Sequence, residues 1–395
     1  DYAQSTGFVD VDAKVYDITV EAIIPGGNMD VIDVAGFSVA ANDRTTVMAA
    51  DVVASITPLV LLDSAATPSS DEVALRVVHA SPAAAGVVAE VDVYVTAPGD
   101  NINAASPALT FAFQEDVDAG ALPAGLVQIR ATGAGSKDVV FDSGPVDLTP
   151  FAGSKLLVAA IDSTNSTEQA GSPIKLLVAT DSDYVTLLDT DTLSGARVVH
   201  ASPDADAIAG PVEVFASSSV LPGSPVELID AFSYLEAVPG VDSFVGLPAG
   251  DYIFDVAPDT DMIGDSVFTS DSVTLDQGSE YTVIAAGRVA SAPAFGLLLT
   301  ADNLRPVATQ ASVKFIHAAP AAGVVQVYVT TAGEFSVADV AAGNAGDPLL
   351  LDFSFGDITG DVAVPPGNYD VRVVAGGVVA IDVENFNLAA SSVST

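Results

Sequence analysis

The sequence predicts an all-β protein built of tandem antiparallel β-sandwich modules, immunoglobulin-like or transthyretin-like in architecture. Three observations predict this fold. Short β-rich runs separated by Gly, Pro, Asp and Ser follow one another along the chain. Stretches with a helical period are few. An eight-residue signature also recurs three times at the spacing of whole domains, which indicates several sandwiches in a row.

The signature is Leu-Arg-Val-Val-His-Ala-Ser-Pro at 75–82, and related stretches stand at 196–203 and 313–320. Each copy continues with the same landmarks in the same order. An alternating Val-x-Val strand comes first, then a pair of aromatic residues, then a turn that contains Pro and Gly. Alternation along the strand places its valines on one face and its polar residue on the other.

The repeat divides the chain into four parts. We expect two complete modules, at 71–193 and 194–310, and two partial ones. Residues 311–395 match about the first three quarters of a module and are expected to lack its last two strands. Residues 1–70 match about the second half.

Two stretches near the start of the chain carry this match. Thr46-Val-Met-Ala-Ala50 aligns with Thr282-Val-Ile-Ala-Ala286, which belongs to a late strand of the module at 194–310. Tyr16-Asp-Ile-Thr-Val20 aligns with Tyr369-Asp-Val-Arg-Val373. The two partial modules therefore overlap at the Tyr16 and Tyr369 strands.

The signature, the Val-x-Val-Tyr-Val strand and the Leu-Pro-Ala-Gly turn resemble a family of prokaryotic cell-surface domains called domain of unknown function 4397. The resemblance covers about 73 to 395 and, by internal homology, part of 1–70. It is weaker at 313–320, where Phe315 and Ile316 depart from the signature. The resemblance implies a secreted β-sandwich that occurs in tandem on surface proteins, and it supplies no catalytic residues.

Charge and composition exclude several classes of function. The net charge of −40, from 52 acidic and 12 basic residues, would repel nucleic acid and anionic lipid. No apolar run approaches the roughly 20 residues that cross a membrane, so membrane insertion is not expected. The absence of cysteine removes thiol chemistry. Because the chain starts at Asp1, we expect an extracellular or cell-surface protein whose signal peptide has been removed.

The signature histidines and basic residues are predicted to be structural. Each module has one histidine, whereas metal sites use three or four ligands. We expect each histidine to hydrogen-bond the main chain and hold the following turn, and each basic residue to pair with acidic neighbours in its module. These residues are His79, His200, His317, Arg76, Arg197 and Lys314.

No constellation of residues predicts an enzyme. A Gly-x-Ser-x-Gly turn is absent, and no pair of acidic residues recurs in the modules. We therefore predict no catalytic residue and no cofactor. The Asp-rich loops leave calcium open as an alternative, with Asp259, Asp261 and Asp265 as candidate ligands, although a complete set of six to eight oxygens is not evident.

The partial modules predict the function. A sandwich without two strands exposes its core and unpaired main-chain groups, and strand addition from another chain would cover them. Residues 45–51 and 58–63 are the matching strands. We therefore predict a subunit of an extracellular filament that binds copies of itself head to tail. The predicted polymer interface contains Val47, Met48, Leu59, Leu61, Leu62, Tyr16, Tyr369, Val371 and Val373.

Three alternatives remain open at this point. In the first, the N-terminal strands complete the last module of the same chain and give a monomer. In the second, the chain is an arbitrary fragment of a longer repeat protein. In the third, the modules form a monomeric surface adhesin or carbohydrate-binding stalk, with surface glycans as partners. Aromatic residues opposite the valine face could then stack on sugars; these are Tyr94, Phe215 and Tyr328.

Overall fold

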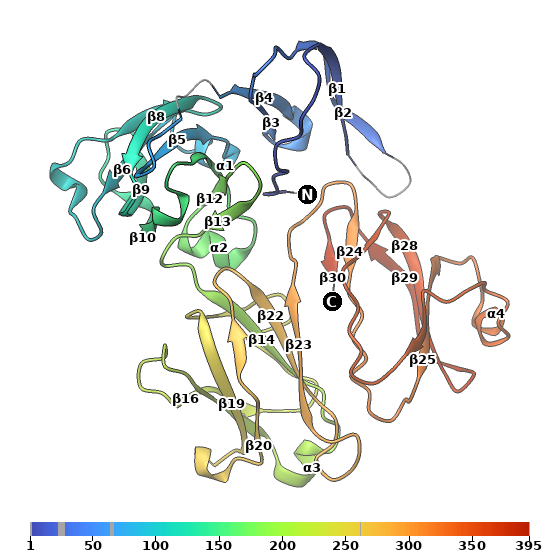
Figure 1. The fold of residues 1–395 in the computed structure, drawn as a ribbon. Helices are drawn as coiled ribbons and strands as arrows, with labels where there is room; N and C mark the ends of the chain where they lie inside the picture. Colours follow the sequence, from blue (N-terminus) through green and yellow to red (C-terminus); the bar gives the residue numbers. More distant parts are fainter. Residues whose placement is uncertain (1, 23–27, 64–66, 261, 395) are drawn as a thin grey trace. The chain divides into compact units, whose positions relative to one another are not determined.

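The structure, a computed structural model, describes residues 2–22, 28–63, 67–260 and 262–394. They form two compact units, one with the described residues up to Thr192 and one from Leu193 onward. Strands dominate both units (Figure 1). The α-helices are α1 (Pro82–Ala85), α2 (Ser166–Gly171), α3 (Ala205–Ala209) and α4 (Val337–Ala341). The 3-10 helices are η1 (Val53–Ser55), η2 (Ile102–Ala104), η3 (Thr149–Phe151) and η4 (Ile263–Asp265).

The N-terminal region consists of two antiparallel strand pairs. Its strands are β1 (Val15–Ala22), β2 (Met29–Ser38), β3 (Thr45–Ala50) and β4 (Thr57–Leu62). β1 pairs with β2, and β3 pairs with β4. In the β3–β4 hairpin, Val47 lies opposite Val60 and Met48 lies opposite Leu59. Because side chains alternate along a strand, these two pairs lie on opposite faces of the hairpin.

The first sandwich comprises residues 72–187. Its five-stranded sheet has the order β13-β12-β11-β5-β8, and its four-stranded sheet the order β10-β9-β6-β7. The first sheet contains β5 (Glu72–His79), β8 (Asp116–Pro123), β11 (Lys155–Asp162), β12 (Ile174–Ala179) and β13 (Tyr184–Leu187). The second contains β6 (Glu90–Thr96), β7 (Leu109–Ala112), β9 (Leu126–Gly133) and β10 (Val139–Asp147).

Each face of the five-stranded sheet has its own apolar contacts. Alternation along β5 sends Leu75 and Val77 into the core between the two sheets. Val78 belongs to a separate cluster, and Met48 and Leu59 pack against that cluster. The β3–β4 hairpin thus packs on the outer face of this sheet through one of its two faces.

The second sandwich comprises residues 194–302. Its first sheet has the order β17-β14-β22-β23, with β18 also paired to β14, and its second the order β16-β15-β19-β20, with β21 also paired to β19. The first contains β14 (Ser194–His200), β17 (Ala237–Val238), β18 (Val245–Leu247), β22 (Glu280–Ala286) and β23 (Gly296–Asp302). The second contains β15 (Val212–Ser217), β16 (Val226–Phe232), β19 (Gly250–Pro258), β20 (Phe268–Thr269) and β21 (Val273–Leu275).

The third sandwich comprises residues 311–394 and has the sheet orders β27-β24-β30 and β26-β25-β28-β29. Two small apolar clusters fill it, in contrast to the large continuous core of each of the other sandwiches. The first sheet contains β24 (Ala311–Val313), β27 (Val362–Val364) and β30 (Val393–Ser394). The second contains β25 (Val325–Thr331), β26 (Leu350–Phe353), β28 (Gly367–Ala375) and β29 (Val378–Leu388).

The predicted all-β sandwich fold is confirmed, with one feature that the sequence did not reveal. The signature strand of each sandwich pairs in parallel with a strand far along the chain: β5 with β11, β14 with β22 and β24 with β30. The parallel pairing covers six residue pairs in the first and second sandwiches and two in the third. In the described part of the chain, no helix combines the length and the apolar character that crossing a bilayer requires.

Candidate functional site

In two sandwiches, the basic residue of the signature, here called the signature cation, contacts the strand hairpin that precedes it in the chain. The contact is made to the last strand of that hairpin. Arg76 donates a hydrogen bond to the main-chain oxygen of Leu62. Lys314 donates one to the main-chain oxygen of Ala301 over 2.6 Å. Leu62 lies opposite Thr45 in its hairpin, as Ala301 lies opposite Tyr281.

These two contacts are equivalent. Thr45 and Tyr281 each directly precede the aligned Thr-Val-x-Ala-Ala stretch, so Leu62 and Ala301 occupy the same position of the repeat. An acidic residue follows in both cases: Asp63 lies 3.1 Å from the Nζ of Lys155, and Asp302 lies 3.2 Å from the Nζ of Lys314. We call this arrangement the module joint.

The signature cations also pair with acidic residues of their own sandwich. Arg76 donates to Asp116 over 2.7 Å. Arg197 lies 3.2 Å from Asp302, and Lys314 lies 3.6 Å from Asp361. Asp302 therefore contacts Arg197 of its own sandwich and Lys314 of the next one.

The three signature histidines are buried and make the same main-chain contact. The Nδ1 of each accepts a hydrogen bond over 3.3 Å from the N–H two residues later, and the donors are Ser81, Ser202 and Ala319. Each ring also contacts the aromatic pair of its sandwich. Burial lowers the pKa of His79 and of His200. These contacts fix the turn that follows the signature strand.

The structure separates the predicted interface residues of the β3–β4 hairpin into different environments. Met48 and Leu59 pack on the first sandwich of their own chain, and Leu61 is buried. Val47 and Leu62 are exposed on the other face. Exposure of Val47 is 40%, whereas Val283, its counterpart in the second sandwich, is 5% exposed.

The third sandwich has a matching set of uncovered positions. Tyr369, Val371 and Val373 lie on β28 and are all half-buried. Their counterparts on β19 of the second sandwich are fully buried; these are Tyr252, Phe254 and Val256. The same strand thus has a covered inner face in the second sandwich and a partly uncovered one in the third.

The tyrosines of these strands also hold their own turns. Tyr369 donates a hydrogen bond to the main-chain oxygen of Pro365 over 2.7 Å, and Tyr252 donates one to Pro248 over 2.6 Å. Tyr16 makes the same contact with Asp12 over 2.8 Å. This is the local geometry of a tyrosine corner, in which the hydroxyl fixes the chain a few residues upstream.

The aligned repeats lead to Phe315, a further site residue that sequence reasoning missed. Val77 pairs in parallel with Val158, and Val198 pairs with Val283. Phe315 holds the corresponding position of the third sandwich, two residues before His317, and is half-buried. Among the described residues, β24 has only β30 on this side, and that pairing ends at Val313. The repeat alignment contained this signal, but the parallel pairing was needed to use it.

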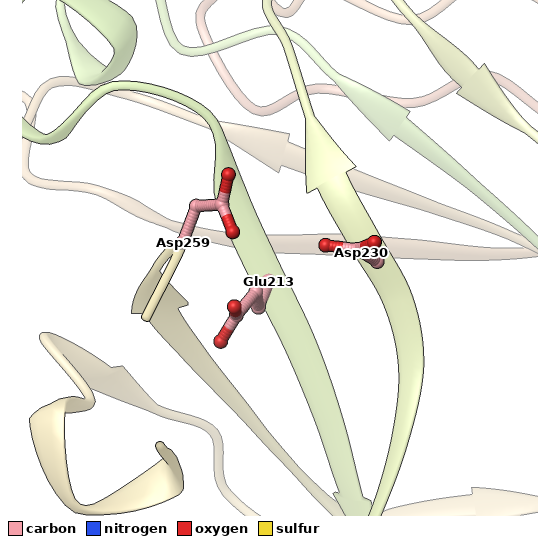
Figure 2. Close-up of side chains that lie close together, drawn as sticks. All are labelled: Glu213, Asp230 and Asp259. Atoms are coloured by element: carbon pink, nitrogen blue, oxygen red, sulfur yellow. The ribbon is translucent and has the colours of Figure 1, made fainter. Parts of the chain in front are cut away.

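The two calcium candidates that the structure describes, Asp259 and Asp265, do not share a cluster of carboxylates. Asp259 lies with Glu213 and Asp230, and one carboxylate oxygen of each is within 4.8 Å of the others (Figure 2). Glu213 is buried on β15, whereas Asp230 and Asp259 are exposed. Asp265 instead accepts a hydrogen bond from Thr260 over 3.1 Å. Asp261 is outside the described residues. Three carboxylates would supply only part of the six to eight oxygens that calcium takes.

The aromatic residues considered for sugar stacking are not accessible. Tyr94, Phe215 and Tyr328 are all buried. Lys137 lies over the Tyr94 ring and hydrogen-bonds its hydroxyl over 2.9 Å. A sugar ring therefore has no open aromatic face at these positions, and the structure corrects this part of the carbohydrate hypothesis.

Fold and joints together define a protein of tandem β-sandwiches in which one contact occurs twice, between the N-terminal hairpin and the first sandwich and between the second and third sandwiches. Residues 1–90 and 194–328 match the model of the family described as "Domain of unknown function (DUF4397)". The chain therefore belongs to this family. A search of curated proteins finds no match.

One solved structure shows a remote likeness. It is described as a "putative cell adhesion protein" from Bacteroides ovatus, and it is 12% identical, with a TM-score of 0.21. The match covers 60% of this chain and 97% of that one. At this score the likeness carries no argument about the function of the chain.

Proposed function

We propose that this chain is the structural subunit of an extracellular filament. Copies join head to tail when the β3–β4 hairpin of one copy completes the third sandwich of the next. This role requires no catalytic residue, cofactor, nucleic acid or membrane insertion, and we propose none. The observation that carries the proposal is the exposure of Val47 together with the partly uncovered core of the third sandwich.

The strand register of the second sandwich predicts which residues of two copies would pair. In the second sandwich, β22 lies parallel to β14 and places Val283 beside Val198. Because Val47 aligns with Val283 and Phe315 with Val198, the same register places Val47 of one copy beside Phe315 of another. In this register Thr45 takes the place beside Val313 that Ser394 of β30 holds in the free chain, so assembly displaces the end of β30. β4 then occupies the position of β23, and Val47 becomes buried over the half-buried face of β28.

The module joint supports head-to-tail addition of copies. The N-terminal hairpin contacts the first sandwich through Arg76 and Leu62. The second sandwich contacts the third through Lys314 and Ala301 in the same way. A hairpin that completes the third sandwich of a neighbouring copy remains attached to its own first sandwich by this joint. The same contact would then connect each added copy to the copy before it.

Two contributions to the free energy of association favour such a contact. Each main-chain hydrogen bond added to the sheet contributes about 1 kcal/mol net, and burial of an exposed valine contributes about 1.5–3 kcal/mol. The net charge of −40 on each copy opposes association. Salt screens this repulsion, because the Debye length falls to about 3 Å at 1 M. Assembly should therefore strengthen with salt.

Electron microscopy of the purified chain at high salt, after negative staining, tests the proposal with two matched variants. Val47→Asp places a charge where the joint needs a buried side chain, and it should abolish fibres. Val60→Asp is the control on the same hairpin face: Val60 is 41% exposed, and Leu299, its counterpart in the second sandwich, is 39% exposed. Because both valines are exposed in the free chain, both variants should fold.

The outcomes separate the proposal from its alternatives. Fibres from the wild type and Val60→Asp, but not from Val47→Asp, support strand complementation. Fibres of normal yield from Val47→Asp contradict the assigned joint. Compact single-chain particles under all conditions contradict the filament, and they favour either closure within one chain or a monomeric surface adhesin.

A further inference from the structure

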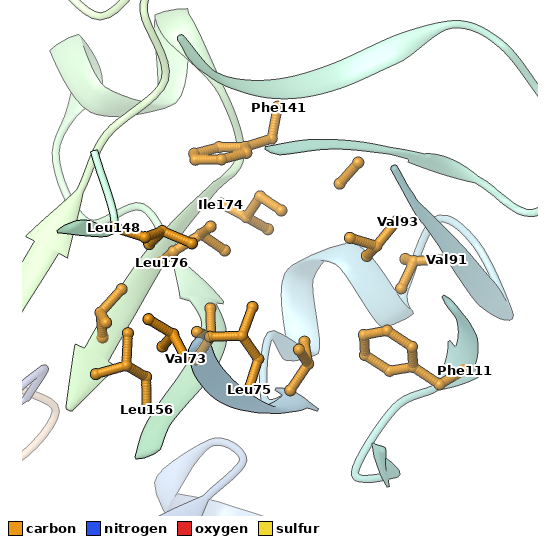
Figure 3. Packing of buried hydrophobic residues seen from close by; sticks show 14 residues of the cluster. Val73, Leu75, Val91, Val93, Phe111, Phe141, Leu148, Leu156, Ile174 and Leu176 are labelled. Carbon is orange, nitrogen blue, oxygen red and sulfur yellow. The ribbon is translucent and has the colours of Figure 1, made fainter. Parts of the chain in front are cut away.

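The core of the first sandwich encloses a cavity of about 230 Å³. Side chains from both sheets surround it, among them Leu75, Val93, Phe111 and Phe141 (Figure 3). The corresponding space in the second sandwich measures only about 40 Å³. The two sandwiches share a fold and a signature, but of these two only the first has a large cavity.

The chemistry of the wall limits what the cavity can hold. Of the described residues that line it, His79 and Thr132 have polar side chains, and none has a charged one. Thr132 already hydrogen-bonds main-chain oxygens of its own turn. Apolar cavities of this kind stay dry and take up small apolar molecules, because a water molecule needs several polar partners.

His79 provides one unused hydrogen-bond donor. Its Nδ1 accepts a hydrogen bond from the Ser81 N–H, so the proton of the neutral ring lies on Nε2. Nε2 is buried, and it has no hydrogen-bond partner among the described residues. In the third sandwich the Nε2 of His317 lies 2.8 Å from the oxygen of Gly323. The Nε2 of the signature histidine thus has a hydrogen-bond partner in the third sandwich and none among the described residues in the first.

One part of the cavity wall lies at the surface. Val87 lines it and is 84% exposed. Val87 follows helix α1, whose residues Ala83 and Ala84 also form part of the wall. The wall of the cavity therefore reaches the surface beside this short helix.

We propose that the first sandwich binds a small, neutral, apolar molecule that carries one hydrogen-bond acceptor oxygen. The apolar body fills the cavity, and the oxygen accepts a hydrogen bond from the Nε2–H of His79. An engineered cavity of about 150 Å³ holds benzene, so the present volume suits roughly eight to ten non-hydrogen atoms. A carboxylate is excluded, because no basic side chain lines the cavity and a buried unpaired charge is costly.

Isothermal titration calorimetry of the full chain with 2-octanone, an eight-carbon ketone, tests this binding. We expect one saturable site. Val93→Phe fills the cavity and should weaken binding by at least about tenfold. Val214→Phe is the matched control, because Val214 lines the small cavity of the second sandwich. It should leave the affinity for 2-octanone unchanged.

Two further probes test the assigned chemistry. Octanoate, which has the same chain length but a charge, should not bind at neutral pH. Octane lacks the acceptor and should bind more weakly than 2-octanone. Failure of 2-octanone to bind the wild type, or equal binding to Val93→Phe, would overturn the proposal. Equal affinity for octanoate would contradict the neutral ligand, and equal affinity for octane would contradict the role of His79. Circular dichroism of both variants verifies that they are folded.

Discussion

Lys314 donates a 2.6 Å hydrogen bond to the main-chain oxygen of Ala301, and so connects the third sandwich to the last strand of the second. Its Nζ also lies 3.2 Å from Asp302, and both side chains are buried. Arg76 reaches Leu62 in the equivalent place. Because the same contact occurs at two points of the chain, we infer that it is a general feature of the junctions between modules.

Lys314→Met should destabilise the second and third sandwiches together. The substitution leaves the oxygen of Ala301 without its buried donor and reduces the positive charge beside Asp302, at a cost of about 1–3 kcal/mol. Chemical denaturation followed by circular dichroism measures this loss. Asp361→Asn is the control, because Asp361 is partly exposed and lies 3.6 Å from Lys314. It should cost less than about 1 kcal/mol. Equal effects of the two changes would contradict the joint.

The tyrosine corners of the second and third sandwiches should differ in the free chain. Tyr252→Phe removes a buried hydroxyl that hydrogen-bonds the oxygen of Pro248, and it should cost about 1–2 kcal/mol. Tyr369→Phe should cost less, because Tyr369 is half-buried and water can replace its hydroxyl at Pro365. Denaturant unfolding of both variants, at protein concentrations too low for fibres to form, measures the difference in unfolding free energy. A larger cost for Tyr369→Phe would show that the third sandwich is already covered.

Acid should destabilise the chain before its carboxylates titrate. Burial lowers the pKa of His79 and of His200, although nearby Asp162 acts in the opposite direction on His79. The folded chain therefore binds fewer protons than the unfolded chain below the unfolded histidine pKa of about 6.5. Stability should be fully present above this pH and should fall as the pH drops from about 7 to 5.

His79→Gln isolates this contribution. Gln has an oxygen that can accept the Ser81 N–H, but it does not titrate. The drop in melting temperature between pH 7 and pH 5 should be smaller in the variant than in the wild type. An unchanged drop would assign the acid sensitivity to other groups.

The repeated strands and turns of the fold were predictable from the sequence, and the sheet topology was not. Alternation in Val91-Asp-Val93 and the turn before Gly125 indicate strands locally. The parallel pairing of β5 with β11 joins residues about eighty positions apart. No local pattern encodes such a pairing, because it depends on how the intervening strands cross to the other sheet.

The candidate site was predicted only in part, because it too depends on long-range packing. The alignment of Val47 with Val283 correctly identified a hairpin of the repeat. It did not indicate that Met48 and Leu59 would pack on the outer face of their own first sandwich. Which face of a two-faced apolar hairpin is covered depends on tertiary packing, and only the structure separates Val47 from its neighbours.

Cysteine cross-linking between Val47 and Phe315 tests the central claim most directly. The chain has no native cysteine, so each introduced thiol is unique. Val47→Cys and Phe315→Cys are made as two single variants, mixed at high salt and treated with a short bis-maleimide. The account predicts a rapid cross-link between the two different variants and a ladder of covalent oligomers from the double variant. Cross-linking of the double variant only within one chain, or no faster than between two Val60→Cys chains, would contradict it.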